Sequence, residues 1–358
     1  IYSFKRTYAN LNYQFSGDID SPGELKETYI LIIGESARKA SMSLYGYHRD
    51  TNPILQNFMA TYRQNIIPYT NAISVSPFTR ASVPVMLSVT DAKSIKALKY
   101  RPSIIKIFNA VGYKTFLISN QPRRGFHHDV ISTMMKDVAS SIYLEDVGSV
   151  DKTYDAAVIP FLERCLKDTS NKKLIVIHLI GSHYNYKERY PPNHSFFEGE
   201  SLVTTYNNSI RYTDLVLGEI AKVVLNSDQA IAVLYVSDHG ENLNDNNDNN
   251  FGHGRNDFTQ YELEIPFIFI FNSAFIETKT SKVEKLIKRK NYAVSHDHVS
   301  HTLLGLAGIY DDQVYKESKD LASPFLFEQG RYVIDRDDMN IFLVNLYKGR
   351  ILKTLSVK

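Results

Sequence analysis

Five short apolar runs place the strongest constraint on the fold of this chain of 358 residues. The runs are rich in Ile, Val and Phe and do not alternate with polar residues, which is typical of strands buried on both faces of a parallel sheet. Longer stretches with helical spacing lie between them, for example the one containing Ile104, Ile107 and Val111. This alternation predicts an α/β fold in which a mainly parallel central sheet has helices on both faces. The five runs are residues 29–33, 115–118, 174–180, 231–236 and 265–271.

Composition narrows the range of partners and compartments. The hydrophobic content of 43% is ample for a large core, and the net charge of +2 supplies no basic field for a nucleic-acid partner. Because Cys165 is the only cysteine, the chain has no intramolecular disulfide, and apolar helical neighbours predict that this thiol is buried. No apolar run approaches the roughly 20 residues of a membrane-spanning helix. The chain begins at Ile1 without a signal segment, so we expect a fragment or a processed form.

Polar residues follow four of the five runs, at the point where each predicted strand ends. They are Glu35 after the first run, Asn120 after the second, His183 after the third, and Asp238 with His239 after the fourth. In parallel α/β sheets, ligands bind beyond the carboxyl ends of the strands. The sequence therefore predicts that these side chains converge on one edge of the sheet and form an active site there.

Carboxylates and imidazoles within this set indicate a metal site. Glu35, Asp238 and His239 supply oxygen and nitrogen donors from separate strand ends, and His253 follows in a short Gly-His-Gly turn. Mixed oxygen and nitrogen ligands suit zinc best, manganese is a second option, and the histidine argues against a site for magnesium alone. The alternative is ordinary capping and salt bridging, which would account for any one of these residues.

Thr79 is the candidate nucleophile. It lies in the run S-V-S-P-F-T-R-A-S-V-P at residues 74–84, which predicts a turn entering a helix. Backbone N–H groups and the helix dipole favour an attacking oxyanion and a bound phosphate at such a place. Coordination to a divalent metal would lower the pKa of the hydroxyl and position its oxygen for in-line attack. Taken alone, Thr79 would be an ordinary residue of a helix N-terminus.

In their order along the chain, these motifs resemble one known family. The blocks I-I-G-E-S-A-R and M-S-L-Y-G-Y-H-R-D-T-N-P, the segment around Thr79, G-S-H at 181–183 and S-D-H-G-E at 237–241 are similar to those of the phosphoethanolamine transferases. Members of that family decorate bacterial lipid A and related envelope glycans. The match runs from residue 27 to residue 307, and it implies the sandwich fold of the alkaline phosphatase/sulfatase superfamily.

The resemblance implies zinc ligands at Glu35, Asp238 and His239. It also implies that Thr79 is both the fourth ligand and the covalent nucleophile.

Four further residues match the family's active site. His183 and His253 correspond to additional histidines that contact the phosphoryl group or a second metal, so one zinc site is expected and a second stays open. Asn120 and Arg124 fall where the family keeps an amide and a basic residue for the substrate phosphate. The basic residue is arginine here, which can bind a phosphate in a bidentate fashion. Arg123 fits this position nearly as well.

The implied reaction is a two-step transfer. Thr79 attacks the phosphorus of phosphatidylethanolamine, releases diacylglycerol and carries phosphoethanolamine until an acceptor takes it. His183 or His253 would protonate the departing oxygen and later deprotonate the acceptor. The acceptor could be lipid A, a core sugar, another periplasmic glycan or a protein.

Two kinds of alternative stay open. One is a phosphoglycerol transferase, another phosphodiesterase or a sulfatase of the same superfamily, although the C-x-P-x-R or S-x-P-x-R nucleophile of sulfatases does not occur at the corresponding place. The other is a non-catalytic glycan-binding module on this fold, which would be expected to lack a metal ligand or the nucleophile.

The same resemblance implies a monomer at the bacterial inner membrane, with its catalytic domain facing the periplasm, and a role in lipopolysaccharide modification and antimicrobial peptide resistance. Residues 27–358 would form the sulfatase-like catalytic domain, and residues 1–26 an amphipathic linker from an N-terminal membrane domain. An apolar stripe supports a helix lying on the membrane surface, and a helix packed on its own domain is the alternative. The stripe consists of Ile1, Phe4, Tyr8, Leu11 and Phe15.

Three other segments have their own predictions. Residues 241–250, E-N-L-N-D-N-N-D-N-N, have too little apolar content to pack and predict a flexible loop rather than a calcium site. The histidine-rich run at 296–301 predicts a helix start rather than a metal site. Residues 332–334 and 341–344 flank a polar turn and predict a small C-terminal hairpin or edge strands.

Overall fold

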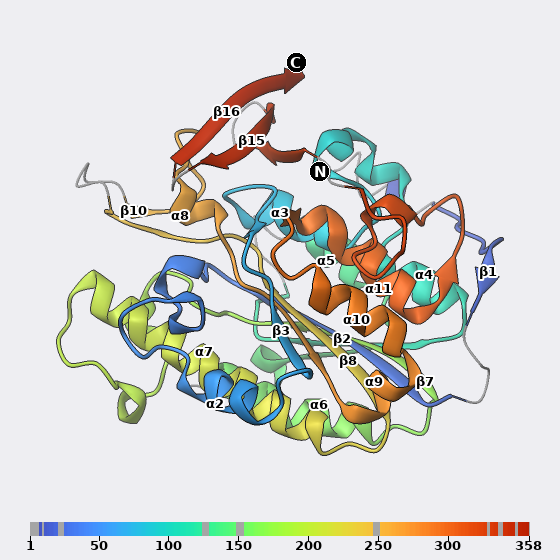
Figure 1. Ribbon diagram of the computed structural model, residues 1–358, viewed down its shortest axis with the longest axis horizontal. Helices are drawn as coiled ribbons and strands as arrows, with labels where there is room; N and C mark the ends of the chain where they lie inside the picture. The colour runs from blue at the N-terminus through green and yellow to red at the C-terminus, as the bar shows by residue number, and fades with distance from the viewer. Residues whose placement is uncertain are drawn as a thin grey trace.

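A seven-stranded mixed sheet forms the centre of the protein (Figure 1). The computed structural model describes residues 7–8, 11–20, 25–123, 129–147, 154–245, 251–327, 330–335, 339–347 and 350–357. The strand order is β3-β11-β8-β2-β7-β5-β6. The bounds of these strands are β2 (Glu27–Gly34), β3 (Ile66–Pro68), β5 (Lys114–Ser119), β6 (Ser140–Tyr143), β7 (Lys172–His178), β8 (Ala230–Ser237) and β11 (Phe267–Phe271).

The sheet is mainly parallel, as the apolar runs predict. Strand β2 pairs in parallel with β7 and β8, and β5 pairs in parallel with β6 and β7. The direction expected for the run at 265–271 is wrong, because β11 lies antiparallel to β8. A parallel strand needs a long crossover that returns the chain to the opposite end of the sheet. The described residues between β8 and β11 contain only the short β9 (Asn242–Leu243), β10 (Phe251–Gly252) and α8 (Gln260–Leu263), so the chain turns back from the same end.

Helices cover both faces of the sheet (Figure 1). One face carries α2 (Pro53–Thr61), α6 (Ile159–Leu166) and α7 (Leu202–Leu225). The other face carries α3 (Thr79–Met86), α4 (Ile104–Ala110), α5 (Asp129–Met135), α9 (Ser273–Thr278), α10 (Thr280–Lys288) and α11 (Val299–Ala307).

Strand β2 shows why the apolar runs do not alternate. Ile30 and Ile32 belong to the hydrophobic core that includes α7. Leu31 and Ile33 belong to the core on the opposite face, which includes α11. Because every residue of β2 is buried, successive side chains fill two different cores and both must be apolar.

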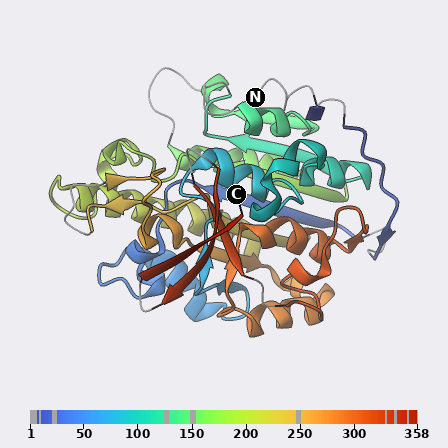
Figure 2. The ribbon, with the colours of Figure 1, turned by 90° about the horizontal axis from the view of Figure 1, so that it is seen from above.

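A separate three-stranded antiparallel sheet lies near the C-terminus, and its strands are β14 (Arg331–Ile334), β15 (Ile341–Tyr347) and β16 (Arg350–Val357). The predicted hairpin is confirmed, with Ile334 opposite Ile341. Strand β16 was not predicted. The Ile334 N–H donates to the Val75 carbonyl over 2.8 Å, which ties the small sheet to the segment before α3. Figure 2 shows the three strands on the outside of the molecule over this region.

Short elements complete the fold. The two-residue strands are β1 (Asp18–Ile19), paired with β13 (Ile309–Tyr310), and β4 (Ala72–Ile73), paired with β12 (Val294–Ser295). The 3₁₀ helices are η1 (Lys39–Ser41), η2 (Ser43–Tyr45), η3 (Ala92–Tyr100), η4 (Leu144–Asp146), η5 (Asp155–Val158), η6 (Tyr186–Glu188), η7 (Pro192–His194), η8 (His296–His298) and η9 (Glu317–Lys319). Helix η8 leads directly into α11, which confirms the predicted helix start.

The described part of the N-terminal segment packs against the protein. Tyr8 is 1% exposed, and its hydroxyl donates to Asp137 over 2.6 Å. Phe15 packs against the same core, although residues 11–16 are not helical. At Tyr8 and Phe15, these contacts favour packing on the chain's own domain over a helix that lies on the membrane surface. Ile1 and Phe4 lie outside the described residues. Among the described residues, none of the helices has the length and apolar character needed to cross a membrane.

Candidate active site

The register of β2 and β8 brings the first site residues together. Gly34, at the end of β2, pairs with Ser237, at the end of β8. Glu35 and Asp238 are the next residues along these strands and are buried side by side at the carboxyl edge of the sheet. The backbone N–H of Ser36 donates to an Asp238 carboxylate oxygen over 3.0 Å, which fixes this pair of strand ends.

Thr79 points into the same place from the first turn of α3. Its hydroxyl oxygen lies 2.6 Å from Asp238 Oδ2, 3.3 Å from Glu35 Oε2 and 3.2 Å from His239 Nε2. The His239 Nε2 atom lies 3.4 Å from Glu35 Oε1 and 3.3 Å from Asp238 Oδ2. The structure therefore brings together all four residues that the sequence suggests as metal ligands. Their ligand role remains a prediction.

The backbone orients the His239 ring. Its Nδ1 atom lies 2.8 Å from the carbonyl oxygen of Gly240, which can only accept a hydrogen bond. Nδ1 therefore carries the proton, and the lone pair of Nε2 is directed at the hydroxyl of Thr79. This is the arrangement in which histidines commonly bind metals in proteins.

The charges of this cluster favour a cation. Burial raises the pKa of Glu35 well above its usual range, and the neighbouring Asp238 charge raises it further. Burial lowers the pKa of His239 well below its usual range, so the ring is neutral. Two carboxylates and a neutral imidazole, all buried within 4.8 Å of one another, are suitable donors for zinc. The residues present therefore fit the predicted ion.

His183 and His253 lie beside this cluster. Their ring centroids are 6.0 Å apart, and the His253 ring is 4.0 Å from that of His239. His183 follows Gly181, which has a φ of +51° and lies so close to Glu35 that a Cβ atom would come within 2.5 Å of its carbonyl oxygen. Only glycine allows the end of β7 to approach β2 this closely. His183 and His253 also form a second group of potential ligand atoms with Glu35.

Glu241 is a site residue that the sequence reasoning missed. It is fully buried, and one carboxylate oxygen lies 2.6 Å from His253 Nδ1 while the other accepts a hydrogen bond from the Tyr186 hydroxyl. Burial lowers the pKa of His253, but the Glu241 charge and hydrogen bond outweigh burial and raise it to about 9. The signal was available, because Glu241 ends the same S-D-H-G-E run that contains Asp238 and His239.

The predicted phosphate-binding residues have a different environment. The Asn120 amide donates to Asp155 over 2.7 Å, and Asp155 also accepts from the N–H groups of Ile180 and Gly181. Asn120 thus helps to join the ends of β5 and β7. Its neighbour Gln121, which was not predicted, donates its amide to the Leu179 carbonyl over 3.0 Å and lies 3.5 Å from Glu35 Oε2.

Of the two arginines considered for phosphate binding, the structure describes Arg123. Arg124 lies outside the described residues. Arg123 forms an ion pair with Asp146 and stacks on the Tyr143 ring at 4.4 Å. For both arginines, and for Asn120, substrate binding stays a prediction.

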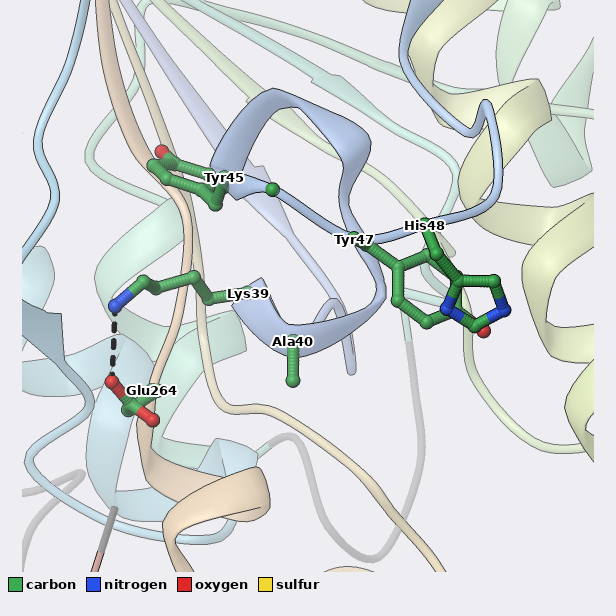
Figure 3. Close-up of a pocket in the computed structure, with 7 residues that line it drawn as sticks. Lys39, Ala40, Tyr45, Tyr47, His48 and Glu264 are labelled. Atoms are coloured by element: carbon green, nitrogen blue, oxygen red, sulfur yellow. Dashed lines mark hydrogen bonds and ion pairs between the residues drawn. The ribbon is translucent and has the colours of Figure 1, made fainter. Parts of the chain in front are cut away.

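A cavity of about 300 Å³ is lined by residues that follow Glu35 closely in the sequence (Figure 3). Its wall includes Lys39, four residues beyond Glu35, and Glu264, and the two side chains form an ion pair of 3.0 Å. The remaining lining residues are Ala40 and four residues of the M-S-L-Y-G-Y-H-R-D-T-N-P block, Tyr45, Gly46, Tyr47 and His48.

The predicted loop at 241–250 is partly ordered in the described residues. Asn242 and Leu243 form β9, which pairs with β10. The expectation of a loop is therefore wrong for these two residues, whose backbone is held by Phe251 and Gly252. Residues 246–250 lie outside the described part of the chain.

The fold and the cluster of donors at the strand ends define the class of protein. The Sulfatase family model matches residues 27–309, and the chain belongs to this family. The chain is 27% identical over 329 residues to phosphoethanolamine transferase EptC of Escherichia coli O18:K1:H7, covering 88% of this chain and 56% of that protein. It is 29% identical to EptA of Helicobacter pylori, covering 84% of this chain and 58% of that protein. The chain thus spans little more than half the length of these relatives.

Solved structures of related proteins have the same fold as this chain. The C-terminal periplasmic domain of EptC from Escherichia coli superposes with a TM-score of 0.81 and 25% identity, covering 96% of both chains. The same domain in complex with zinc gives a TM-score of 0.81 at 24% identity, covering 96% of both chains. These likenesses confirm the predicted alkaline phosphatase/sulfatase-like fold.

Proposed function

We propose that this chain is the catalytic domain of a phosphoethanolamine transferase that uses zinc and forms a covalent intermediate on Thr79. The observation that carries the proposal is the position of the Thr79 hydroxyl, within 3.3 Å of Glu35, Asp238 and His239. Phosphatidylethanolamine is the proposed donor. Lipid A, a core sugar, another periplasmic glycan or a protein is the proposed acceptor.

Two displacements at phosphorus account for the transfer. In the first, the Thr79 hydroxyl loses its proton and its oxygen bonds to the phosphorus, the bond from phosphorus to the glycerol oxygen breaks, and that oxygen takes a proton as diacylglycerol leaves. In the second, an acceptor oxygen loses a proton and bonds to the phosphorus, the bond to Thr79 breaks, and the Thr79 oxygen regains a proton. His253, held by Glu241, or His183 moves the proton in each step.

Zinc is the proposed cofactor. Glu35, Thr79, Asp238 and His239 would hold it, and a second ion would use His183 and His253 with Glu35. Bound zinc would lower the pKa of the Thr79 hydroxyl and balance the negative charge of the phosphoryl oxygens.

The proposed location in the cell is inferred from the descriptions of related proteins. A solved relative from Neisseria meningitidis is described as an integral membrane protein, and the EptC structures as periplasmic domains. We propose that this domain acts as a monomer at the periplasmic face of the inner membrane. Residues 1–26 would be the linker and residues 27–358 the catalytic domain.

Intact mass spectrometry tests the proposal. After incubation with a short-chain phosphatidylethanolamine and no acceptor, the zinc-loaded protein should gain roughly 123 Da, the mass of one phosphoethanolamine on the nucleophile. Phosphatidylglycerol serves as the competing donor. A phosphoglycerol adduct instead would point to the phosphoglycerol transferases, and the absence of any adduct or transfer would refute the proposed chemistry.

A further inference from the structure

Two aromatic side chains are exposed at the rim of the candidate active site. Tyr184 is 54% exposed and Phe251 is 51% exposed, and an exposed apolar patch of neighbouring rings is more informative than a single exposed apolar residue. Their ring centroids are 5.7 Å apart and their planes are tilted by 46°. The pair therefore presents a continuous aromatic surface to the solvent.

This pair is attached directly to the two site histidines. Tyr184 follows His183, and its carbonyl oxygen lies 2.6 Å from His183 Nδ1. Phe251 lies in β10, two residues before His253. The Tyr184 ring also contacts the Tyr186 ring at 5.6 Å in an edge arrangement, and Tyr186 bonds to Glu241. The rings are thus fixed relative to the residues proposed to move protons.

We propose that Tyr184 and Phe251 form a platform on which a sugar ring of the acceptor stacks beside the reacting phosphorus. The inference rests on the proposed function and adds a glycan as the class of acceptor. The axial C–H groups of a pyranose give it an apolar face that packs on aromatic rings, while its hydroxyls need polar neighbours. Aromatic side chains with one apolar face and a polar surrounding are suited to such ligands.

The surroundings favour a sugar over a lipid tail. Phe251 pairs with Leu243, so the polar residues Asn242 and Asn244 flank its strand partner, and Asp245 follows them. The basic residues nearest to the two rings along the chain are paired with carboxylates: Lys187 with Glu200, Arg189 with Glu188 over 3.2 Å, and Arg255 with Asp257 over 3.0 Å. Their charge is therefore already balanced within the protein, whereas a surface that binds anionic headgroups presents basic residues to the membrane. Asparagine and aspartate side chains are hydrogen-bonding partners for hydroxyl groups. Next to the other ring, Asn185 and Glu188 supply further polar groups, and their side chains are 3.3 Å apart.

The test compares Tyr184→Ser, Phe251→Ser and the double variant with Tyr62→Ser. Tyr62 is a matched control, because it is also an exposed aromatic residue, at 40%, but lies at the end of α2. With a deacylated, phosphorylated glucosamine disaccharide as acceptor, the double variant should show an acceptor KM raised by about tenfold. Formation of the adduct from short-chain phosphatidylethanolamine alone should keep the wild-type rate.

Binding of the same disaccharide, followed by saturation-transfer difference NMR, separates this inference from the proposed function. Signals weakened in the double variant but retained in Tyr62→Ser support the platform, even if the wild type forms no adduct. Equal acceptor KM and equal NMR signals in wild type and double variant would overturn it. A loss confined to adduct formation from phosphatidylethanolamine vesicles would also overturn it, since the rings would then contact the lipid donor.

Discussion

The Nδ1 atom of His253 lies 2.6 Å from a carboxylate oxygen of Glu241, and both residues are close to the cluster around Thr79. A carboxylate in this position fixes the ring so that Nε2 faces the site. Tyr186 holds the second oxygen of the same carboxylate, so its orientation is determined from two sides.

We therefore predict that Glu241→Gln lowers kcat for transfer by about 10- to 100-fold, the usual effect of losing a partner that orients an active-site histidine. The amide keeps the size of the side chain but no longer carries the charge that supports His253. Glu219→Gln, at an exposed glutamate of α7 that pairs with Lys222, is the control. An unchanged kcat in Glu241→Gln would show that His253 does not need this partner.

Thr79 gives the sharpest test of the covalent step. Thr79→Ala should abolish both the adduct and the transfer, because the attacking oxygen is gone. The protein should stay folded, with a stability cost of about 1 kcal/mol or less for one hydroxyl at a helix start. Thr79→Ser retains the hydroxyl and should keep measurable transfer. Intact mass spectrometry and thermal unfolding of both variants check this, and an adduct in Thr79→Ala would place the nucleophile elsewhere.

Removal of metal should inactivate the protein, and zinc should restore activity better than magnesium, because imidazole and carboxylate ligands together favour zinc. Zinc should also raise the unfolding temperature, since a ligand that binds only the folded state stabilises it. In Asp238→Asn both responses should be much weaker. Full turnover after exhaustive chelation, verified by elemental analysis, would contradict the site assignment.

The sequence predicts the parts of this site that depend on strand ends. Glu35 and Asp238 follow two apolar runs. Such residues converge whenever the two strands are parallel neighbours, as β2 and β8 are. The direction of β11 was not predictable from its composition, because a buried strand is apolar in either direction. The environment of Asn120 depends on Asp155, 35 residues away, and no local pattern indicates that pairing.

The histidine-rich helix start also contains a link that spacing does not reveal. His296 is buried, and its Nε2 atom lies 2.9 Å from the Ser237 carbonyl, directly before Asp238. The Val75 N–H, in the segment leading to Thr79, donates to the Nδ1 atom over 3.4 Å. The His296 ring thus joins the segment that leads to Thr79, the proposed nucleophile, with the segment that leads to Asp238, a proposed metal ligand. Burial lowers the pKa of His296 to about 4, so the ring is neutral and donates through Nε2.

We predict that His296→Leu lowers kcat by more than its effect on folding explains, because the two segments lose their common partner. It leaves a buried N–H and a buried carbonyl unpaired, at a cost of about 1–3 kcal/mol each. His296→Gln can replace the donor to Ser237 and should recover part of kcat. His301→Gln is the matched control: His301 is equally buried on the adjoining helix but bonds to the Lys316 N–H. It should lose stability and keep kcat per folded molecule. Equal kcat in His296→Leu and His301→Gln, after correction for the folded fraction, would reduce His296 to a purely structural role.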